Sequence, residues 1–267
     1  MIIAGIDVGA LTTKIVLLTE RKEMLGYSIL PNGANVKKLA QVVFDQALEH
    51  AHLSRNDITY IVSTGYGRRI VPFANSEVTE ITCHGKGAYW FCPEVRTVID
   101  IGGQDSKAIR VDSKGLVTNF AMNDKCAAGS GRFLEVMAHA LEVKLEDMGE
   151  LSLQAKKALN ISSTCTVFAE SEVISLLTEG HSVKDILAGL HLSISKRVVG
   201  LVERVGIAER VAMTGGVAKN IGVVKAIESL LGITLIIPEE PQIVGALGAA
   251  LVAAEKYQAL LKTSSMN

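Results

Sequence analysis

The sequence predicts an α/β protein made of two lobes that are built alike. Predicted strands and helices alternate along the chain, which is typical of an α/β fold. Residues 6–14 (IDVGALTTK) recur as residues 99–107 (IDIGGQDSK), so that Asp7 matches Asp100. Because the match keeps its spacing within two β-hairpin contexts, it favours duplicated lobes over two unrelated turns of a common type. A length of 267 residues is sufficient for two lobes with separate cores.

The first lobe is expected to begin as a β-sheet. Short apolar runs predict strands at residues 2–8, 14–19, 24–30 and 58–63. Leu39, Val43 and Ala47 recur at helical spacing and predict an amphipathic helix. The helices expected in this lobe are residues 36–51 and 77–91.

The rest of the chain is expected to hold the second lobe and a final helix. The predicted elements are a β-rich segment, a helical region broken near 160–164, a strand–turn–helix, a strand and a last helix, at residues 95–122, 132–205, 210–231, 234–237 and 242–261. We assign residues 1–95 to lobe I and residues 96–241 to lobe II. Helix 242–262 is expected to complete lobe I.

Composition excludes several classes of protein. A net charge of −1 and an aromatic content of 4% give no reason to expect nucleic acid or an anionic membrane surface as a partner. The N-terminal apolar run has no basic flank and is interrupted at Asp7, so neither a signal peptide nor a membrane span is expected. Four cysteines in a chain of this length do not indicate a disulfide scaffold. We therefore expect a soluble cytoplasmic protein.

The repeated hairpins suit a phosphate ligand. Each copy ends an apolar strand with an aspartate, turns at glycine and enters a second apolar strand. Backbone N–H groups at such a turn can approach an anion closely, and flanking hydroxyls and a lysine add donors. The aspartate can hold Mg²⁺ through water or orient an attacking water. Two such hairpins that face one another across a cleft would hold a polyphosphate from both sides.

The candidate site residues follow from these turns. For Mg²⁺ and the attacking water we name Asp7, Asp100, Gln104 and Asp105. For phosphate contact we name Gly9, Thr12, Thr13, Lys14, Gly102, Gly103 and Lys107, although Lys107 could instead be a solvated strand residue. Gly129 and Gly131 suit either a helix start or nucleotide approach, and Gly215 and Gly216 suit the nucleoside, with ordinary tight turns as the alternative for all four. Walker and Rossmann glycine motifs are absent from the sequence.

Two isolated cysteines precede helical patterns. Cys126 comes before residues 132–141, and Cys165 comes before residues 167–177, with Ser162–Thr164 as possible capping residues. The positive end of a helix dipole favours anionic sulfur, so both could be thiolate ligands. Free cysteines are also common in cores, and the residues alone leave the two interpretations open. A zinc site built from all four thiols is poorly motivated, because the spacing is not that of a zinc knuckle.

The remaining cysteines favour a structural interpretation. Cys83 and Cys92 are not at a recognised ligand spacing and are expected in the core. His84 is expected to be a hydrogen-bonded helix residue. Glu170 and Glu172 are expected to be cap, dipole or interface charges rather than catalytic groups.

The motifs together resemble a known family. The order of hairpin, hairpin and strand–GG–helix resembles the actin, sugar kinase and heat-shock chaperone ATPase superfamily. Within it the chain closely resembles the ATP-dependent activators of 2-hydroxyacyl-CoA dehydratases and the related ATPase subunits of benzoyl-CoA reductase. The segments that carry this nearly end-to-end resemblance are IDVG, STGYGR, EITCHG, VIDIGGQDSK, MNDKCAAGSGRFL, SSTCTVFAESEVIS, MTGGVA and GALGAAL. In the first phosphate turn the family's usual GSTxSK is replaced by GALTTK, so Ala10 and Leu11 contribute no side-chain donors.

The resemblance implies a two-lobed actin-like (ribonuclease H-like) ATPase fold with duplicated lobes around a cleft for ATP or ADP. It implies that Cys126 and Cys165 bind iron, and that a homodimer combines two such pairs around one shared 4Fe–4S cluster. ATP hydrolysis would then drive one low-potential electron from reduced ferredoxin or flavodoxin into a 2-hydroxyacyl-CoA dehydratase. The alternatives are an ATPase subunit of a benzoyl-CoA-type reductase, a kinase of a sugar-like small molecule, and a non-enzymatic interaction module such as a filament-forming actin relative.

Overall fold

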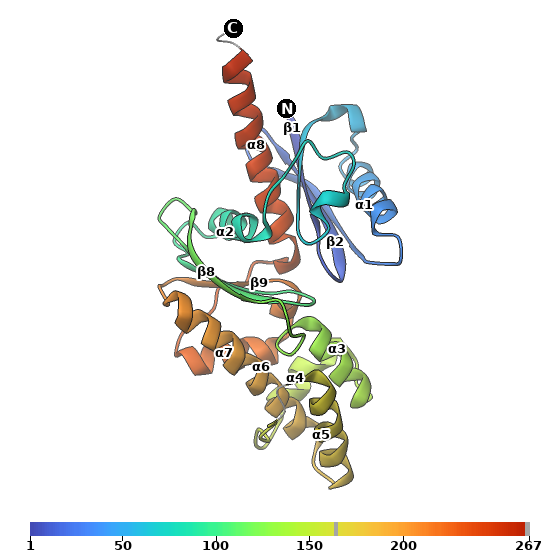
Figure 1. Cartoon of the computed structure of the whole chain (residues 1–267), viewed down its shortest axis with the longest axis vertical. Coiled ribbons are helices and arrows are strands. Elements are labelled where there is room, and N and C mark those ends of the chain that lie inside the picture. The colour runs from blue at the N-terminus through green and yellow to red at the C-terminus, as the bar shows by residue number, and fades with distance from the viewer. Residues whose placement is uncertain (163–164, 265–267) are drawn as a thin grey trace. The chain divides into compact units, whose positions relative to one another are not determined.

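The computed structural model describes residues 1–162 and 165–264, which form two compact units (Figure 1). Unit 1 consists of Met1–Val95, Val111–Val117 and Gln242–Asn267. Unit 2 consists of Arg96–Arg110 and Thr118–Pro241. Each unit contains one of the two repeated aspartate–glycine turns, and each is described by itself.

Unit 1 contains a five-stranded sheet with the strand order β3-β2-β1-β4-β5. The strands are β1 Ile2–Val8, β2 Thr12–Thr19, β3 Met24–Pro31, β4 Ile58–Thr64 and β5 Ser76–Glu77. β1 pairs antiparallel with β2 and parallel with β4. The helices are α1 Val36–His50, α2 Glu80–Phe91 and α8 Val244–Ser264. The helix expected from residue 77 was wrong at its start, because Ser76 and Glu77 pair with β4 and Thr79 is the N-cap.

Helices cover both faces of this sheet. Ile3 belongs to a core shared with α8, whereas Ala4 and Ile6 belong to a core shared with α1. This alternation follows from the two-residue period of a strand. At Gly5 the backbone of α8 lies so close that an added Cβ would collide with Ala246. α8 therefore packs directly on the central strand, and Figure 1 shows it in red beside β1.

α8 is unusually apolar. By length and composition the segment Pro241–Thr263 is able to cross a membrane, but 67% of its most apolar window is buried in the protein. An apolar helix that is buried on most sides is typical of a domain core.

Glycine allows α2 and α8 to approach one another closely. A Cβ on Gly248 of α8 would overlap the backbone carbonyl of Cys83 on α2. We expect Gly248→Ala to lower the free energy of unfolding by about 1–3 kcal/mol, because the two helices must separate. The control is Gly200→Ala within a helix of unit 2, where an added Cβ meets nothing within 4 Å. That change should raise stability by about 0.5–1 kcal/mol, since alanine is the better helix former. Urea unfolding of both variants checks the pair, and equal effects would contradict it.

Unit 2 is built on the sheet β8-β7-β6-β9. Its strands are β6 Thr97–Ile101, β7 Ser106–Val111, β8 Val117–Asn123 and β9 Val211–Thr214. Its helices are α3 Gly131–Ala140, α4 Met148–Leu153, α5 Thr166–Thr178, α6 Val183–Val205 and α7 Ile221–Leu231. The strand expected at residues 234–237 was wrong, because only a single bridge between Ala212 and Ile236 forms there. A single hydrophobic cluster joins β6, β7 and β9 to these helices.

Candidate functional site

The two repeated hairpins have the same geometry. In unit 1, Asp7 of β1 lies opposite Lys14 of β2. In unit 2, Asp100 of β6 lies opposite Lys107 of β7. The turns also match, because the Gly9 N–H donates to the Thr12 carbonyl at 3.0 Å and the Gly102 N–H donates to the Asp105 carbonyl at 2.9 Å. The sequence repeat therefore corresponds to a repeated three-dimensional turn.

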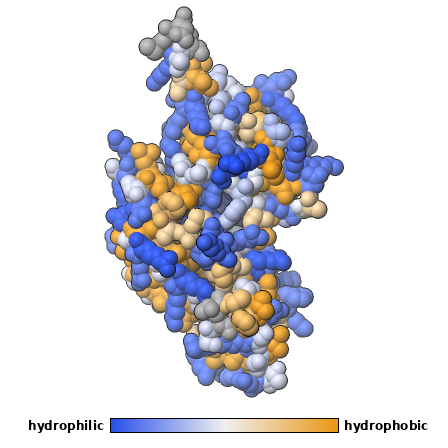
Figure 2. Space-filling model, viewed as in Figure 1, coloured by the Kyte–Doolittle hydropathy of each residue, from blue (hydrophilic) through white to orange (hydrophobic). Residues whose placement is uncertain are grey.

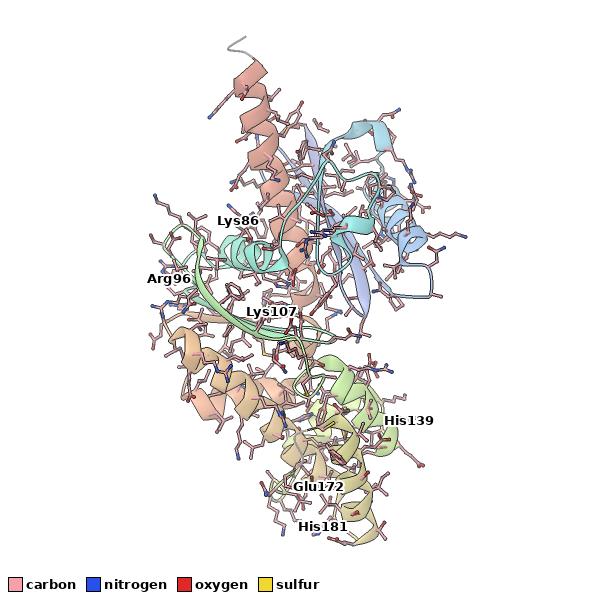
Figure 3. All side chains as sticks on the ribbon, viewed as in Figure 1. Lys86, Arg96, Lys107, His139, Glu172 and His181 are labelled. Atoms are coloured by element: carbon pink, nitrogen blue, oxygen red, sulfur yellow. The ribbon has the colours of Figure 1, made fainter. Side chains whose placement is uncertain are left out.

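Each hairpin pairs its lysine with its aspartate. Lys14 Nζ lies 3.1 Å from Asp7 Oδ2. Lys107 Nζ, labelled in Figure 3, lies 3.3 Å from Asp100 Oδ2 and 2.6 Å from Asp105 Oδ2. The three side chains in unit 2 are at most 5% exposed. In this state the lysines neutralise buried carboxylates, and the phosphate contacts expected for Lys14 and Lys107 stay predictions.

Some of the expected phosphate donors are used within the turns. The Gly9 and Gly102 N–H groups close the two turns, as above. The buried Thr13 hydroxyl donates to Asn32 Oδ1 at 2.8 Å. Asn32 in turn donates to the Gly9 carbonyl at 2.7 Å and so organises the first turn. Asn32 was not recognised in the sequence, because it is 23 residues from the glycine that it contacts.

Other backbone donors of the turns have no hydrogen-bond partner among the described residues. They are the N–H groups of Ala10, Leu11, Gly103 and Gln104. Positions 10 and 11 correspond to positions 103 and 104 in the repeat. Successive N–H groups at a turn form an anion-binding concavity that needs no side-chain donor. This geometry makes the apolar side chains of Ala10 and Leu11 compatible with a phosphate site.

A second pair of turns lies beside the two aspartates. Thr64 of β4 is the parallel partner of Asp7, and Thr214 of β9 is the parallel partner of Asp100. Each threonine is followed by a glycine with positive φ, +85° at Gly65 and +84° at Gly215. A Cβ on Gly215 would lie 2.8 Å from Asp100 Oδ1, and a Cβ on Gly65 would collide with Asp7 Oδ1. The sequence analysis named only the turn of unit 2, although the Thr-Gly pair occurs in both.

The region around Asp7 contains two further groups from α2. A Cβ on Gly245 would lie 2.9 Å from His84 Nε2 and 3.0 Å from Asp7 Oδ2, so both atoms border the same small space. His84 is thus nearer to the candidate site than its expected role in the helix indicated. Cys83 is fully buried, and burial raises the pKa of its thiol to about 12. Cys83 is a core thiol, as expected, whereas Cys92 is only partly buried.

The hairpin of unit 2 is hydrogen-bonded to the start of α3. The Gly131 and Arg132 N–H groups donate to the Gly102 and Gly103 carbonyls, each at 2.8 Å. Gly131 is the first residue of α3, so its place in the structure is that of a helix start. Gly129 has φ +104° and an added Cβ would lie 3.5 Å from the Arg197 stem. The phosphate turn and α3 therefore form one connected element.

The two isolated cysteines lie at the beginning of this helical region. Cys165 is the N-cap of α5, as its sequence context indicated. Cys126 lies in the loop before α3, whose N-cap is Ser130, so the expectation of a helix directly after Cys126 was wrong. Both thiols are free and partly exposed, and α3 packs on α5. Among the described residues no group of three or more His, Cys, Asp or Glu side chains could hold a metal ion.

The beginning of α5 is held by a carboxylate. Glu172 Oε1 accepts from the Ser162 N–H at 2.9 Å, which agrees with a capping role for this residue, and Figure 3 labels it on α5. Ser163 and Thr164, named as possible caps, lie outside the described residues.

One face of α5 is apolar and exposed. Val167 and Phe168 are 66% and 69% exposed, directly after Cys165, and Ile174 is 51% exposed. Figure 2 shows hydrophobic residues at the surface in the lower part of the view, where Figure 1 places α3 and α5. Exposed apolar side chains that gather in one patch are typical of an interaction surface.

The glycine turn of unit 2 leads into α7 through a buried polar network. Gly215 and Gly216 precede a short 3₁₀ turn, and Asn220 then caps α7 by accepting from the Val223 N–H at 3.1 Å. Asn220 Nδ2 lies 3.3 Å from His191 Nε2, and His191 Nδ1 lies 2.9 Å from Ser152 Oγ. Because Ser152 donates to the Gly149 carbonyl at 2.7 Å, its oxygen accepts from Nδ1–H of His191.

This network makes stability depend on pH. Burial lowers the pKa of His191 from 6.5 to about 4. Between these values the unfolded chain binds a proton at His191 that the folded chain does not, so the free energy of unfolding falls as the pH falls through this window. We expect a loss of about 3 kcal/mol between pH 7 and pH 4 from this group. Urea unfolding at several pH values should show a shallower dependence in His191→Gln, and equal slopes would contradict the assignment.

Comparison with known proteins identifies the family. The BadF/BadG/BcrA/BcrD ATPase family matches residues 4–253. The chain is 50% identical over 254 residues to the activator of lactoyl-CoA dehydratase of Anaerotignum propionicum, covering 95% of this chain and 98% of the relative. It is 49% identical over 253 residues to the (R)-2-hydroxyglutaryl-CoA dehydratase activating ATPase of Acidaminococcus fermentans, covering 94% and 96%. Identity to a benzoyl-CoA reductase component of Thauera aromatica is 36% over 208 residues, covering 76% and 73%.

Solved structures agree with this result. The activator of the 2-hydroxyisocaproyl-CoA dehydratase from Clostridium difficile, solved with bound ADPNP, is 42% identical with a TM-score of 0.93 over 98% of both chains. A ROK family glucokinase from Streptomyces griseus has a TM-score of 0.60 at 12% identity, covering 96% of this chain and 100% of the other, which shows the fold alone. The predicted actin-like ATPase fold is thereby confirmed. The chain belongs to the BadF/BadG/BcrA/BcrD ATPase family.

Proposed function

We propose that the chain is the ATP-hydrolysing activator of a 2-hydroxyacyl-CoA dehydratase and delivers one low-potential electron to it. The observation that carries the proposal is the combination of two Asp–Lys hairpins with two free, partly exposed cysteines beside α3 and α5. The hydrogen bonds from Gly131 and Arg132 tie the second hairpin to α3. The full-length relatives named as dehydratase activators support the same activity.

In the proposed nucleotide site, each unit contributes one turn to the phosphates of ATP or ADP. The N–H groups of Ala10, Leu11, Gly103 and Gln104 suit this contact, because they have no other partner among the described residues. Thr12 and the two hairpin lysines would add donors once phosphate is bound. The Gly215–Gly216 turn would lie against the nucleoside. ATP turnover by the family supports this use of the turns.

Mg²⁺ would be held by Asp7 and Asp100. Each carboxylate already has a lysine partner, so contact with the ion through water suits these groups better than loss of the lysine. Asp105 binds Lys107 and thereby keeps the ammonium beside Asp100. Gln104 is exposed at the turn and would orient the attacking water.

Iron would be held by Cys126 and Cys165. A 4Fe–4S cluster needs four thiolates and supplies one-electron chemistry when it is bound. This chain offers two thiols in unit 2, and the exposed apolar side chains beside Cys165 suit a contact with a second copy. A homodimer would therefore complete the ligand set and cover the apolar face of α5. Reduced ferredoxin or flavodoxin in the cytoplasm would be the electron donor.

An activation assay tests the proposal. Anaerobically purified protein, ATP·Mg²⁺ and a chemical reductant are mixed with a 2-hydroxyacyl-CoA dehydratase, and formation of the enoyl-CoA is followed. We expect dehydration only when all components are present, and none when ADPNP replaces ATP. Phosphoryl transfer to a sugar by colourless protein would instead support the kinase alternative. Full dehydratase activity without this chain would contradict the proposal.

A further inference from the structure

The two aspartates have nearly the same surroundings but differ in one hydrogen bond. In unit 2, Thr214 Oγ1 donates to Asp100 Oδ1 at 2.9 Å. In unit 1, Thr64 occupies the corresponding position, as the parallel partner of Asp7 and the residue before a positive-φ glycine. The Thr64 side chain is 0% exposed, yet its hydroxyl has no hydrogen-bond partner among the described residues.

An unsatisfied buried hydroxyl is unfavourable, so its retention calls for a state in which it is satisfied. The thiol of Cys83 lies beside Thr64, but a thiol is only a weak hydrogen-bonding group. Oδ1 of Asp7 lies against Gly65, the residue that follows Thr64, just as Oδ1 of Asp100 lies against Gly215. The missing bond therefore requires only rotation of two side chains that are already neighbours in the sheet.

We propose that Thr64 is a positioning residue for Asp7 and that its hydroxyl donates to Asp7 Oδ1 when nucleotide and Mg²⁺ bind. The inference rests on the proposed ATPase function. With Oδ2 on Lys14 and Oδ1 on Thr64, Asp7 acquires the arrangement that Asp100 already has with Lys107 and Thr214. The nucleotide-free protein is thus asymmetric, with one aspartate fixed and the other able to turn. Binding converts the second aspartate to the fixed arrangement.

Three variants test this inference. Thr64→Val keeps the shape of the side chain and removes the unsatisfied hydroxyl, so the urea midpoint of the nucleotide-free protein should stay the same or rise. Thr214→Val removes a bond that is already made, so its midpoint should fall. For ATP hydrolysis, Thr64→Val should lower kcat about tenfold with KM changed less than about twofold, because the bond forms only after binding. Thr64→Ser restores the donor and should return kcat to within about threefold of the unmodified protein.

The outcomes separate this inference from the proposed function. Unmodified protein that hydrolyses ATP while Thr64→Val has the same kcat would overturn the role of Thr64 and leave the function intact. A fall of the nucleotide-free midpoint in Thr64→Val, as large as in Thr214→Val, would also overturn it, since the hydroxyl would then already be bonded. Absence of ATP hydrolysis in the unmodified protein would overturn the proposed function and, with it, this inference.

Discussion

Replacement of Cys126 or Cys165 by serine is expected to remove the iron from the protein. Anaerobically purified protein should contain about four irons per dimer, and each single variant should contain almost none, because one substitution removes two of four thiolate ligands from a symmetric site. Both cysteines lie outside the hairpins, so ATP binding should be retained. Iron analysis and the visible spectrum measure the first effect, and ATP-induced thermal stabilisation measures the second.

Cys92→Ser is the matched control for the cysteine variants. Its thiol is free and partly exposed like those of Cys126 and Cys165, but it lies at the end of α2 in unit 1. We expect its iron content and visible spectrum to be those of the unmodified protein. Retention of iron in the double variant of Cys126 and Cys165, or a full set of four irons on a monomer, would refute the shared site.

Asp100→Asn is expected to lower the rate of ATP hydrolysis by about 10²–10⁴, the range for loss of a group that acts directly on the attacking water or its metal ion. The fold should persist, because Lys107 keeps its 2.6 Å contact with Asp105. Iron should also be retained, since the cysteine loops do not contact the altered carboxylate. Steady-state ATP hydrolysis, iron content and the circular dichroism spectrum measure the three expectations.

The contrasting change is Lys107→Met. It would leave Asp100 and Asp105 close together in a buried site without their cation, and loss of a buried partner is strongly destabilising. A large fall in the urea midpoint should accompany it, whereas Asp100→Asn should show a small one. Turnover unchanged in Asp100→Asn would remove this aspartate from the proposed mechanism.

Local pattern was sufficient for most of the fold. The strands at β1, β3 and β4 and the helix α1 were predicted almost to their ends, because period-two and helical apolar patterns depend only on neighbouring residues. The errors came where tertiary contacts decided. Ser76 and Glu77 became a strand because β4 offered an open edge, and residues 234–237 formed only one bridge to β9.

The candidate site divides in the same way. The repeat at Asp7 and Asp100 and the isolated cysteines are visible as short motifs, since a tight turn needs its glycine and acid at fixed spacing. The residues that complete the site come from distant segments. Asn32, Thr64 and His84 reach the first hairpin only through a strand pairing or a helix packing that no local pattern records.

The amino-acid sequence by itself determined the family, the duplicated hairpins and the number of thiols, because these depend on which residues are present and how they are spaced. Only the tertiary structure decided which donors remain available in the phosphate turns and which aspartate is fully hydrogen-bonded. The physical reason is that a hydrogen bond requires contact within about 3 Å. The backbone brings Thr64 beside Asp7 and Thr214 beside Asp100 through parallel strand pairing, across separations in the chain that differ by a factor of about two.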